Sequence, residues 1–520
     1  MKFEVKIIPL ERLETEALAI FVWEKEKERG KEMVTLDTAL GGLLKRITDE
    51  EEFKGESGKI VTLHTHGKIG PSRILVVGLG KKDDFDSATL RRNFAILGRK
   101  AKELKIKTLG LSVSFAREAR FNLKQISQGV TEGLILGTYK FLRYKGEKEK
   151  EGEREVETVV ISAGGAGDLL LIKDGIGHGE IFSQATILAR DLVNEPASVA
   201  TPSYLAKVAK GLVNDEIKCQ IYDKKQMEKM GLGGILGVAR GSDEPPKLIR
   251  LEYKHPTLRP IRHAQGEQVS AKGEVRPGWQ NKKIVLVGKA ITFDTGGLGL
   301  KPGEAMETMK LDMAGGAAIL GVFSVLSRLK PKVWVVGFIP ATENMPSGRA
   351  LKPGDVLRIR NGKTVEVAHT DAEGRIILAD ALSLGVEEKP GLLLDLATLT
   401  GACMVALGEE IAGVFSTDKT AVEKLEKAAQ EAGEKVWSLP LVKEYKEFLK
   451  SPVADLRNIS KVKYGGAITA ALFLEEFVDN VPWVHLDIAG PAYAEKDTPL
   501  VPQGGSGFGV RTILNFLENL

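Results

Sequence analysis

The sequence predicts an α/β protein with two domains, a smaller N-terminal one and a larger C-terminal one that contains the candidate site. With 520 residues, the chain is long enough for two or three domains. Strand and helix patterns alternate over the first 170 residues, as they do in α/β folds. Farther on, apolar segments end in charged residues. This is typical of a mostly parallel central sheet, flanked by helices, with a site at its carboxyl edge.

Residues 1–170 form the predicted N-terminal α/β domain, for which a role in oligomerisation or regulation is expected. Apolar patterns predict strands at 3–8, 17–23, 59–63, 74–79 and 109–113, and helices at 87–104 and 123–137. The mixed-charge run at 145–155 is typical of an exposed hairpin or loop.

A linking segment, 171–190, follows, and a helix is predicted at 179–193 to join the two domains. Residues 191–520 form the larger predicted domain, with a further helix at 420–435. The segment 255–283 is rich in Pro, Gly, Arg and Gln, so it predicts a surface loop or an extended hairpin.

Composition excludes several classes of protein. The 74 Lys and Arg residues nearly balance the 70 Asp and Glu residues, which argues against a general nucleic-acid or membrane binder. No apolar stretch long enough for a transmembrane helix is expected, and the N-terminal residues lack the apolar core of a signal peptide. Cys219 and Cys403 form no disulfide framework and fit a reducing cytoplasm, each as a small buried hydrophobe.

The most informative stretch is 369–375, which reads His-Thr-Asp-Ala-Glu-Gly-Arg. Asp371, Glu373 and Arg375 are spaced two residues apart, so in an extended segment their side chains point the same way. Apolar residues flank the stretch, and converging anions in such surroundings are costly unless something compensates their charge. Divalent metal ions would provide that compensation.

Two further carboxylates lie upstream. A predicted strand over 284–287 leads to Lys289 and Asp294, and Asp312 precedes an apolar run that predicts a helix. Four carboxylates therefore lie at the ends of buried elements, and two divalent ions would balance them. Each acid alone is as well explained as a helix N-cap or a solvated loop residue. Lys289 alone is as well explained as a lysine at the surface end of a strand, so only the combination favours a metal site.

Several motifs, taken together and in this order, resemble the cytosolic-type leucine aminopeptidases. This family of two-metal metallopeptidases has the signature Asn-Thr-Asp-Ala-Glu-Gly-Arg-Leu. Besides the stretch at 369–376, the matching motifs are Asp-Leu-Val-Asn-Glu-Pro at 191–196, Glu-Asn-Met-Pro-Ser-Gly at 343–348, Asp-Leu-Ala-Thr-Leu-Thr-Gly-Ala at 395–402 and Trp-Val-His-Leu-Asp-Ile-Ala-Gly at 483–490. The resemblance is weak before residue 130 and strong from about residue 190. It implies that 191–520 is a catalytic metallopeptidase domain.

The resemblance also implies two metal-ligand sets. One ion would be held by Asp294, Asp371 and Glu373. The other would be held by Lys289, Asp294, Asp312 and Glu373, and the physiological ions would be Mn²⁺ or Zn²⁺, with Mg²⁺ or Co²⁺ as further options. Since an ammonium group cannot coordinate a metal, Lys289 would have to be neutral, and nearby metal charge and burial both lower a lysine pKa.

Two cations carry further expectations from the family. Lys301 matches a second active-site lysine, which would stay charged and stabilise the oxyanion of the tetrahedral intermediate. Arg375 matches an arginine that holds a bicarbonate ion, which would move a proton from the attacking water. The alternative for Arg375 is a salt bridge to one of the carboxylates of the signature.

Peptide substrates with a free N-terminal amine are implied, because that amine can bind one of the metal ions. The residues that match the pocket for the first side chain are Met309, Thr398, Gly401 and Ala489. They are small or apolar, so we expect a broad preference for Leu and other apolar residues. The family further implies a homohexamer, with neither membrane nor nucleic acid as a regular partner.

His369 departs from the family signature, which has Asn at this position. We expect His369 to orient the metal site from a second shell, because imidazole can hydrogen-bond to a neighbouring ligand and titrates near pH ~6.5. Direct ligation of a metal by His369 is the less favoured alternative. The substitution bears on metal preference and pH optimum more than on the reaction class.

Two rival functions use other features of the sequence. A two-metal phosphoesterase would use the same carboxylates, but it would call for phosphate-binding cations and normally for histidine ligands. A DNA-binding role of the N-terminal domain would call for a basic stripe, which the near-balanced charge does not favour.

Overall fold

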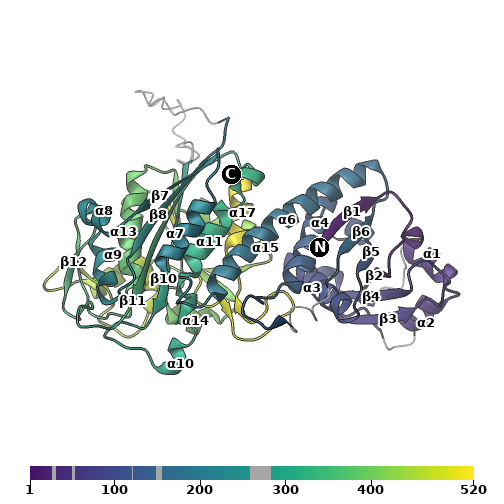
Figure 1. Ribbon diagram of the computed structural model, residues 1–520, viewed down its shortest axis with the longest axis horizontal. Helices are drawn as coiled ribbons and strands as arrows, with labels where there is room; N and C mark the ends of the chain where they lie inside the picture. Colours follow the sequence, from purple (N-terminus) through teal and green to yellow (C-terminus); the bar gives the residue numbers. More distant parts are fainter. Residues whose placement is uncertain (26–30, 50–52, 120, 148–154, 258–282) are drawn as a thin grey trace. The chain divides into compact units, whose positions relative to one another are not determined.

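The computed structural model describes residues 1–520 except 26–30, 50–52, 120, 148–154 and 258–282. They form two compact units (Figure 1). Unit 1 comprises Met1–Ser183 and Lys496–Pro502, and unit 2 comprises Gln184–Glu495 and Gln503–Leu520. Most of the two predicted surface segments, 145–155 and 255–283, lies outside the described residues.

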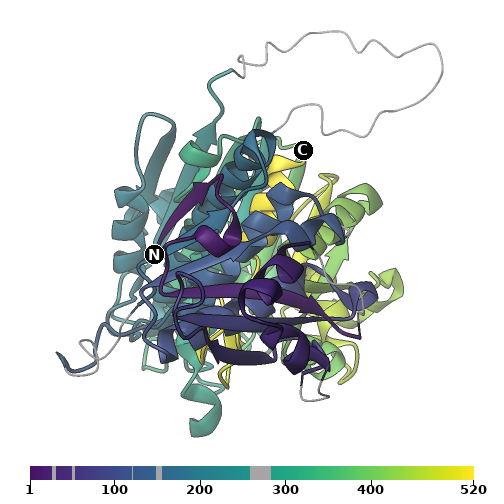
Figure 2. The same cartoon turned by 90° about the vertical axis from the view of Figure 1, so that its right-hand side faces the viewer.

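Unit 1 is built on a six-stranded sheet with the order β1-β6-β5-β2-β4-β3, in which only the β3–β4 pair is antiparallel. The strands are β1 (Lys2–Lys6), β2 (Ala17–Trp23), β3 (Ile60–His64), β4 (Arg73–Gly80), β5 (Thr108–Ser112) and β6 (Thr158–Ser162). Their purple and blue arrows can be followed in Figure 2. The five predicted strands are confirmed to within a few residues. β6 was not predicted.

The helices of unit 1 are α1 (Lys31–Ala39), α2 (Leu43–Asp49), α3 (Ser87–Glu103), α4 (Leu123–Thr138) and the first part of α6 (Ala166–Asn194), which continues into unit 2. The sequence predicted α3 and α4 closely because both have strong N-terminal signals. The Asp86 side chain caps α3, and Asn122 with Gln125 forms a capping box at the start of α4.

A buried ion pair joins α3 to α4. Arg91 Nε lies 2.6 Å from Glu132 Oε2, and both side chains are almost fully buried. Arg91 also donates to the carbonyl of Ser87, and Glu132 accepts from Gln128. One positive and one negative charge thus meet with hydrogen bonds on both sides, as a structural buried pair requires.

The segment 496–502 completes unit 1 from near the end of the chain. Arg99 on α3 donates one hydrogen bond to the carbonyl of Gly137 and another, of 2.6 Å, to the carbonyl of Thr498. The sequence alone does not indicate that residues 496–502 belong to unit 1.

Unit 2 contains a nine-stranded sheet with the order β16-β15-β18-β14-β9-β11-β8-β7, and β10 pairs with β11 beside this path. The strands are β7 (Ile217–Tyr222), β8 (Lys247–Lys254), β9 (Lys283–Gly288), β10 (Ala290–Asp294), β11 (Trp334–Asn344), β14 (Leu392–Ala397), β15 (Ile411–Ser416), β16 (Lys435–Ser438) and β18 (Trp483–Asp487). The central strands β18, β14, β9 and β11 are parallel, which confirms the predicted mostly parallel sheet. Antiparallel pairs occur toward its edges.

Helices cover this sheet, and small sheets lie beside it (Figure 1). The helices are α7 (Pro202–Gly211), α8 (Lys224–Met230), α9 (Gly233–Val238), α10 (Gly303–Met306), α11 (Ala314–Phe323), α12 (Leu326–Leu329), α13 (Gly374–Glu387), α14 (Gly401–Leu407), α15 (Lys419–Ala432), α16 (Gly466–Glu475) and α17 (Val510–Glu518). The short strands are β12 (Val356–Arg358), β13 (Thr364–Glu366), β17 (Leu456–Arg457), β19 (Tyr493–Ala494) and β20 (Gly504–Gly505). The predicted helix at 420–435 corresponds to α15, and the apolar run after Asp312 forms α11 and α12.

One expectation about apolar stretches needs correction. The segment Gly303–Leu329 is long and apolar enough to cross a membrane by length and composition, although no such stretch was expected. However, 78% of its most apolar window is buried inside the protein. Its hydrophobicity is therefore explained by packing: α11 lies against the central strands of unit 2, and all of its residues are buried.

Candidate metal centre

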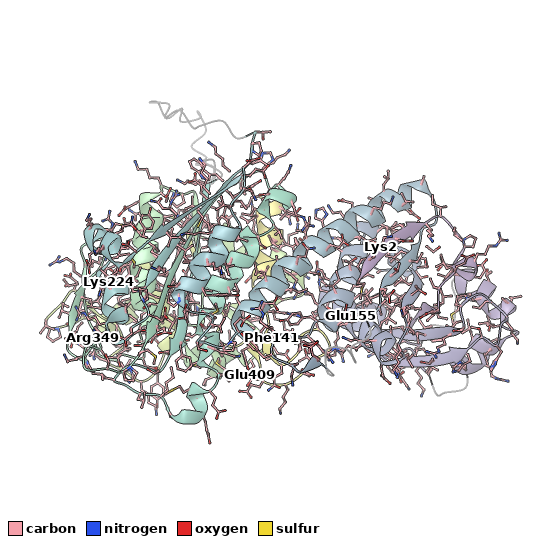
Figure 3. The ribbon with its side chains drawn as sticks, viewed as in Figure 1. Lys2, Phe141, Glu155, Lys224, Arg349 and Glu409 are labelled. Carbon is pink, nitrogen blue, oxygen red and sulfur yellow. The ribbon has the colours of Figure 1, made fainter. Side chains whose placement is uncertain are left out.

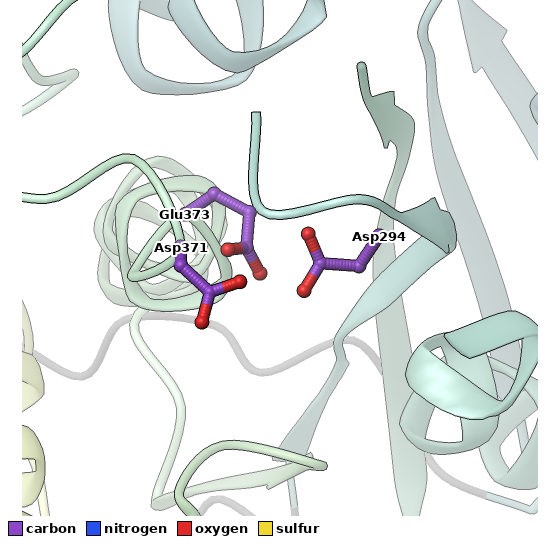
Figure 4. A group of neighbouring side chains, drawn as sticks. All are labelled: Asp294, Asp371 and Glu373. Atoms are coloured by element: carbon purple, nitrogen blue, oxygen red, sulfur yellow. The ribbon is translucent and has the colours of Figure 1, made fainter. Parts of the chain in front are cut away.

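Three carboxylates converge at the carboxyl edge of the large sheet. One oxygen from each of Asp294, Asp371 and Glu373 lies within 4.8 Å of the others, and Figure 4 shows the three groups pointing toward one another. Asp294 ends β10, Asp371 lies in the turn before α13, and Glu373 immediately precedes the first residue of α13. Strand ends and a helix start thus bring together acids that are far apart in the sequence.

The local conformation of the signature differs from the predicted extended segment. Residues 370–371 form a turn, Glu373 already has helical backbone angles, and Arg375 lies in the first turn of α13. Asp371 and Glu373 still converge, but a turn and a helix start bring them together, and strand alternation does not. The spacing of two residues therefore predicted the right partners for the wrong geometric reason.

Asn458 holds this turn, although no sequence pattern indicates that role. Its side chain is fully buried, accepts from the amides of Ala368 and His369, and donates to the carbonyls of His369 and Ala372. Its own carbonyl accepts a 2.9 Å hydrogen bond from Arg375 Nη1. A single asparagine, 83 residues beyond Arg375, therefore replaces the strand partner that an extended segment would have had.

Asn344, at the end of β11, orients two of the acids. Its side-chain amide donates to Asp294 Oδ1 at 2.8 Å and lies 3.4 Å from Glu373 Oε2. The amide of Gly296 gives Asp294 Oδ1 a second donor. Sequence analysis used Asn344 only as part of a matching motif and assigned it no role.

Glycines make room for this arrangement. Gly296 has a φ of +84°, and a Cβ on it would lie 2.8 Å from Asp371 Oδ1 and 2.5 Å from the carbonyl oxygen of Gly299. At Gly374, a Cβ would lie 2.3 Å from Cε of Lys289, so the missing side chain allows Lys289 to reach the acids.

Lys289 and Asp312 form the second half of the cluster. Lys289 follows β9, is buried, and its Nζ lies 2.7 Å from Asp312 Oδ1, 2.8 Å from the carbonyl oxygen of Thr398 and 3.3 Å from Glu373 Oε1. Thr398 also donates its hydroxyl to Asp312 Oδ1. Asp312 Oδ2 is buried and has no hydrogen-bond partner among the described residues.

The balance of burial and neighbouring charges raises the pKa values of Lys289, Asp312 and Glu373 in this cluster. Burial lowers the pKa of Lys289, but the acids Asp312, Glu373 and Asp294 outweigh it and place the pKa above its usual value. Burial raises the pKa of Asp312, and the neighbouring acids add to this against the effect of Lys289. Burial and Asp294 likewise raise the pKa of Glu373. Without metal ions, Lys289 is therefore charged and serves as a counter-ion.

Lys301 lies on the other side of the acids. Its Nζ is 2.5 Å from Asp371 Oδ1 and 3.0 Å from Asp294 Oδ2. Burial lowers the pKa of Lys301, but Asp294 and Asp371 raise it by more than burial lowers it, so the ammonium group is the stable form. Lys301 also borders the open cavity of this site, where it can reach a bound molecule.

Arg375 is buried but forms no ion pair in the described part of the chain, so the predicted alternative of a salt bridge is not observed. Its Nη1 donates to the carbonyl of Asn458, whereas its buried Nε has no partner among the described residues. Burial lowers the pKa of Arg375 to about 10, against the opposing effects of Glu373 and Asp487. The guanidinium therefore stays charged at neutral pH, and Arg375 is among the residues that line the cavity.

A cavity of about 590 Å³ opens over the acids and both lysines. The four residues predicted to bind the first side chain all line it, namely Met309, Thr398, Gly401 and Ala489. Two exposed acids, Glu409 and Glu495, also line it, and Glu409 is labelled in Figure 3. The structure thus brings every predicted site residue to one cavity.

His369 also lines this cavity, and its Nδ1 accepts a 3.1 Å hydrogen bond from the amide of Asp371. An asparagine at this position could offer its side-chain oxygen to the same amide, since Asn commonly bonds to the backbone two residues on. Because Nδ1 is an acceptor, Nε2 carries the proton of the neutral ring. This geometry fits the predicted orienting role of His369 and leaves Nδ1 unable to bind a metal.

The donor set fits divalent metal ions. Hard carboxylate oxygens are the ligands such ions prefer. Burial, with the neighbouring acids, raises the pKa values of Asp312 and Glu373, so a bound cation would stabilise their charged forms. The buried, partnerless oxygen of Asp312 points to the same conclusion.

Comparisons with known proteins agree with this site. Residues 187–514 match the model of the cytosol aminopeptidase family, catalytic domain, and residues 19–148 match its N-terminal domain. Proteins named "Probable cytosol aminopeptidase" are similar over their full length. The one from Alkaliphilus metalliredigens is 40% identical, with 100% of both chains covered, and the one from Aquifex aeolicus is 41% identical, with 98% of this chain and 96% of the relative covered.

Solved structures show the same fold. A mutant of tomato leucine aminopeptidase superposes with a TM-score of 0.85 at 32% identity, covering 100% of this chain and 97% of the other. The bottromycin maturation enzyme BotP in complex with Mn gives a TM-score of 0.81 at 32% identity, covering 97% and 99%. Together with the acid cluster, these matches establish that the chain belongs to the cytosol aminopeptidase family and is a metal-dependent aminopeptidase.

Proposed function

We propose that this aminopeptidase uses two divalent ions, Mn²⁺ or Zn²⁺, to remove Leu and other apolar residues from the N-termini of peptides. The observation that carries the proposal is the cluster of four acids at one cavity, three of them buried, in which the acids outnumber the cations Lys289, Lys301 and Arg375. Asp294, Asp371 and Glu373 would hold one ion. Lys289, Asp294, Asp312 and Glu373 would hold the other.

Bound there, the ions would supply a water of lowered pKa and polarise the scissile carbonyl. Lys289 must lose its proton to act as a ligand, and its present contacts with Asp312 and Glu373 show which acids that proton now neutralises. Asn344 keeps Asp294 and Glu373 oriented when the charge between them changes.

Lys301 remains protonated beside the cavity, so its ammonium group can donate to an oxyanion that develops on the substrate. Arg375 lines the cavity as a charged guanidinium, which suits a small anion such as bicarbonate that accepts and returns a proton. His369 Nδ1 accepts from the amide of Asp371 and is therefore not available as a base.

The assembly and location follow the family resemblance. We propose a homohexamer in the cytoplasm, with peptides as substrates. Sedimentation of the purified protein tests the first point, and a monomer at micromolar concentration would contradict it.

Hydrolysis of leucyl and acetyl-leucyl 4-nitroanilides tests the function, with chelator and with added Mn²⁺ or Zn²⁺. We expect release from the free amine only, loss of activity with chelator and recovery with metal, because a blocked amine cannot bind an ion. Activity on the acetylated substrate, or activity that survives complete metal removal, would contradict the mechanism.

A further inference from the structure

Asp487 lies behind the cavity and is not among the residues that line it. It ends β18, and its side chain is 1% exposed. Neither the family resemblance nor the proposed mechanism gives it a task. A buried carboxylate in a domain of this kind needs partners for its charge, and those partners reveal what it does.

The partners of Asp487 belong to two chain segments that form one wall of the cavity. Its Oδ1 accepts from the backbone amides of Leu399 and Thr400, at 3.2 and 3.4 Å, and from the amide of Ala489 at 3.2 Å. Its Oδ2 accepts a 2.6 Å hydrogen bond from the Thr400 hydroxyl. One carboxylate therefore ties the segment after β14 to the segment after β18.

The hydroxyl of Thr400 extends this connection. Its oxygen also accepts from the amide of Cys403 and so caps the N-terminus of α14. On its other side, the 398–401 segment is fixed by the acid cluster, since Lys289 donates to the carbonyl of Thr398 and Thr398 donates to Asp312. The wall is thus held between the metal centre and Asp487.

We propose that Asp487 is a positioning residue that fixes this wall and thereby sets how strongly the enzyme prefers a large first side chain over a small one. The inference rests on the proposed function in one respect, namely that Thr398, Gly401 and Ala489 contact the first side chain. Asp487 itself touches no substrate. Its effect passes through the backbone of the two segments that it joins.

A hydrogen bond to a charged acceptor is roughly twice as strong as one between neutral groups. Asp487→Asn keeps the shape of the side chain but leaves one neutral acceptor oxygen, with an NH₂ group in place of the other oxygen. We expect the wall to move more freely and to hold a leucine side chain less closely.

The experiment compares kcat/KM for leucyl and alanyl 4-nitroanilides with the Mn²⁺-loaded enzyme. In Asp487→Asn, we expect the Leu:Ala ratio to fall by at least fivefold, mainly through a higher KM for the leucyl substrate. A ratio within twofold of the wild-type value would overturn the proposal. An equal fall in kcat for both substrates would also overturn the proposal, because Asp487 would then act through the charge of Arg375 and not through the wall.

Asp395→Asn is the matched control. Asp395 is a buried acid on the neighbouring strand β14, but it accepts from the side chains of Trp483 and His485, which do not line the cavity. We expect it to lower the melting temperature and to leave the Leu:Ala ratio unchanged. A fall in the ratio equal to that of Asp487→Asn would mean that any damage to the buried polar groups has this effect.

Gly401→Ala tests separately the assumption that the wall contacts the first side chain of the substrate. A Cβ at Gly401 would meet no atom within 4 Å, so the added methyl group points into open space at the cavity. A changed Leu:Ala ratio in this variant shows that the wall contacts the first side chain. An unchanged ratio refutes that assignment and the proposal with it.

If Asp487→Asn does not fold, Thr400→Val takes its place, because it removes the hydroxyl that donates to Asp487 and leaves the carboxylate in place; it also removes the cap of α14. A two- to threefold fall in the ratio is then expected, and an unchanged ratio overturns the proposal.

Discussion

Two buried groups of charges in this molecule differ in how they are compensated. In unit 1, Arg91 and Glu132 match one charge against one and have further hydrogen-bond partners. In unit 2, four acids face three cations, namely Lys289, Lys301 and Arg375. The second group has a partnerless carboxylate oxygen, and burial with the neighbouring acids raises the pKa values of Asp312 and Glu373. An excess of acids over cations, in addition to burial, therefore marks the site that binds metal.

The largest expected effect is on catalysis. Glu373→Gln should lower kcat/KM about a thousandfold, because a lost shared ligand forfeits several kcal/mol of transition-state stabilisation. The same variant should not lower the melting temperature of the metal-free protein, since it removes one of the excess acids. Leucyl anilide hydrolysis and thermal unfolding with chelator measure the two quantities. A strong loss of stability in metal-free Glu373→Gln would contradict the difference between the two buried groups of charges.

Glu132→Gln should show the opposite pattern. Breaking a buried pair leaves Arg91 uncompensated, so the free energy of unfolding should fall by about 3 kcal/mol. Denaturation in urea measures this. The activity of the folded variant should stay within about twofold of the wild type. If its stability is unchanged, the pair in unit 1 is not the structural counterpart proposed here.

Metal binding should stabilise only one of the two groups. At an Mn²⁺ concentration of about 100 times the dissociation constant, linkage predicts a gain of about 2.7 kcal/mol for the wild type. The gain should persist in Glu132→Gln and be largely absent in Glu373→Gln. The melting temperatures of the three proteins, measured with Mn²⁺ and with chelator, test this prediction. Equal shifts in both variants would place the ions elsewhere.

The excess of acids also predicts a pH dependence. Burial and its acidic neighbours raise the pKa of Asp312 to about 8 in the metal-free protein. An unfolded aspartate titrates near pH ~3.9, so between about pH 4 and 8 the folded state binds more protons than the unfolded state. Stability of the metal-free protein should therefore fall as the pH rises through this window. The slope cannot exceed about 1.4 kcal/mol per pH unit for a single group.

Urea denaturation with chelator at several pH values measures this slope. Asp312→Asn removes the titrating group and should flatten the curve, whereas Glu132→Gln should shift the curve without flattening it. A wild-type slope that survives in Asp312→Asn would assign the titration to another group.

The smallest expected effect concerns His369. Asn at this position retains an acceptor for the Asp371 amide, so His369→Asn should change kcat/KM by less than about threefold, whereas His369→Ala should lower it about tenfold. Activity profiles between pH 6 and 9 compare the three proteins. Equal losses in both variants would show that the hydrogen bond to Asp371 is not the role of His369.

Much of the fold could be predicted from the sequence, because its signals are local. Apolar patterns located α3, α4, β2, β4 and β9, and the caps at Asp86 and Asn122 in the structure begin α3 and α4 where those patterns predicted. The acids of the site were also predictable, since four carboxylates at the ends of apolar segments need an explanation. The two asparagines that shape the site, Asn344 and Asn458, were not. Their partners lie between 26 and 90 residues away, and nothing in the residues beside them indicates that contact.

The spacing at 369–375 shows how a local pattern can mislead. Strand alternation and a turn that leads into a helix can both place residues two apart on one side. Only Asn458, which supplies hydrogen bonds to 368–372, decides between them.

The return of 496–502 to unit 1 has a consequence for how the protein is made. On the ribosome, the first 183 residues emerge long before the segment that carries Thr498. Until nearly the whole polypeptide has been synthesised, Arg99 lacks the carbonyl that accepts its second hydrogen bond in the finished molecule. A nascent or truncated chain that stops before residue 496 therefore contains a first domain with one piece missing, and expression of residues 1–183 alone would yield that incomplete form.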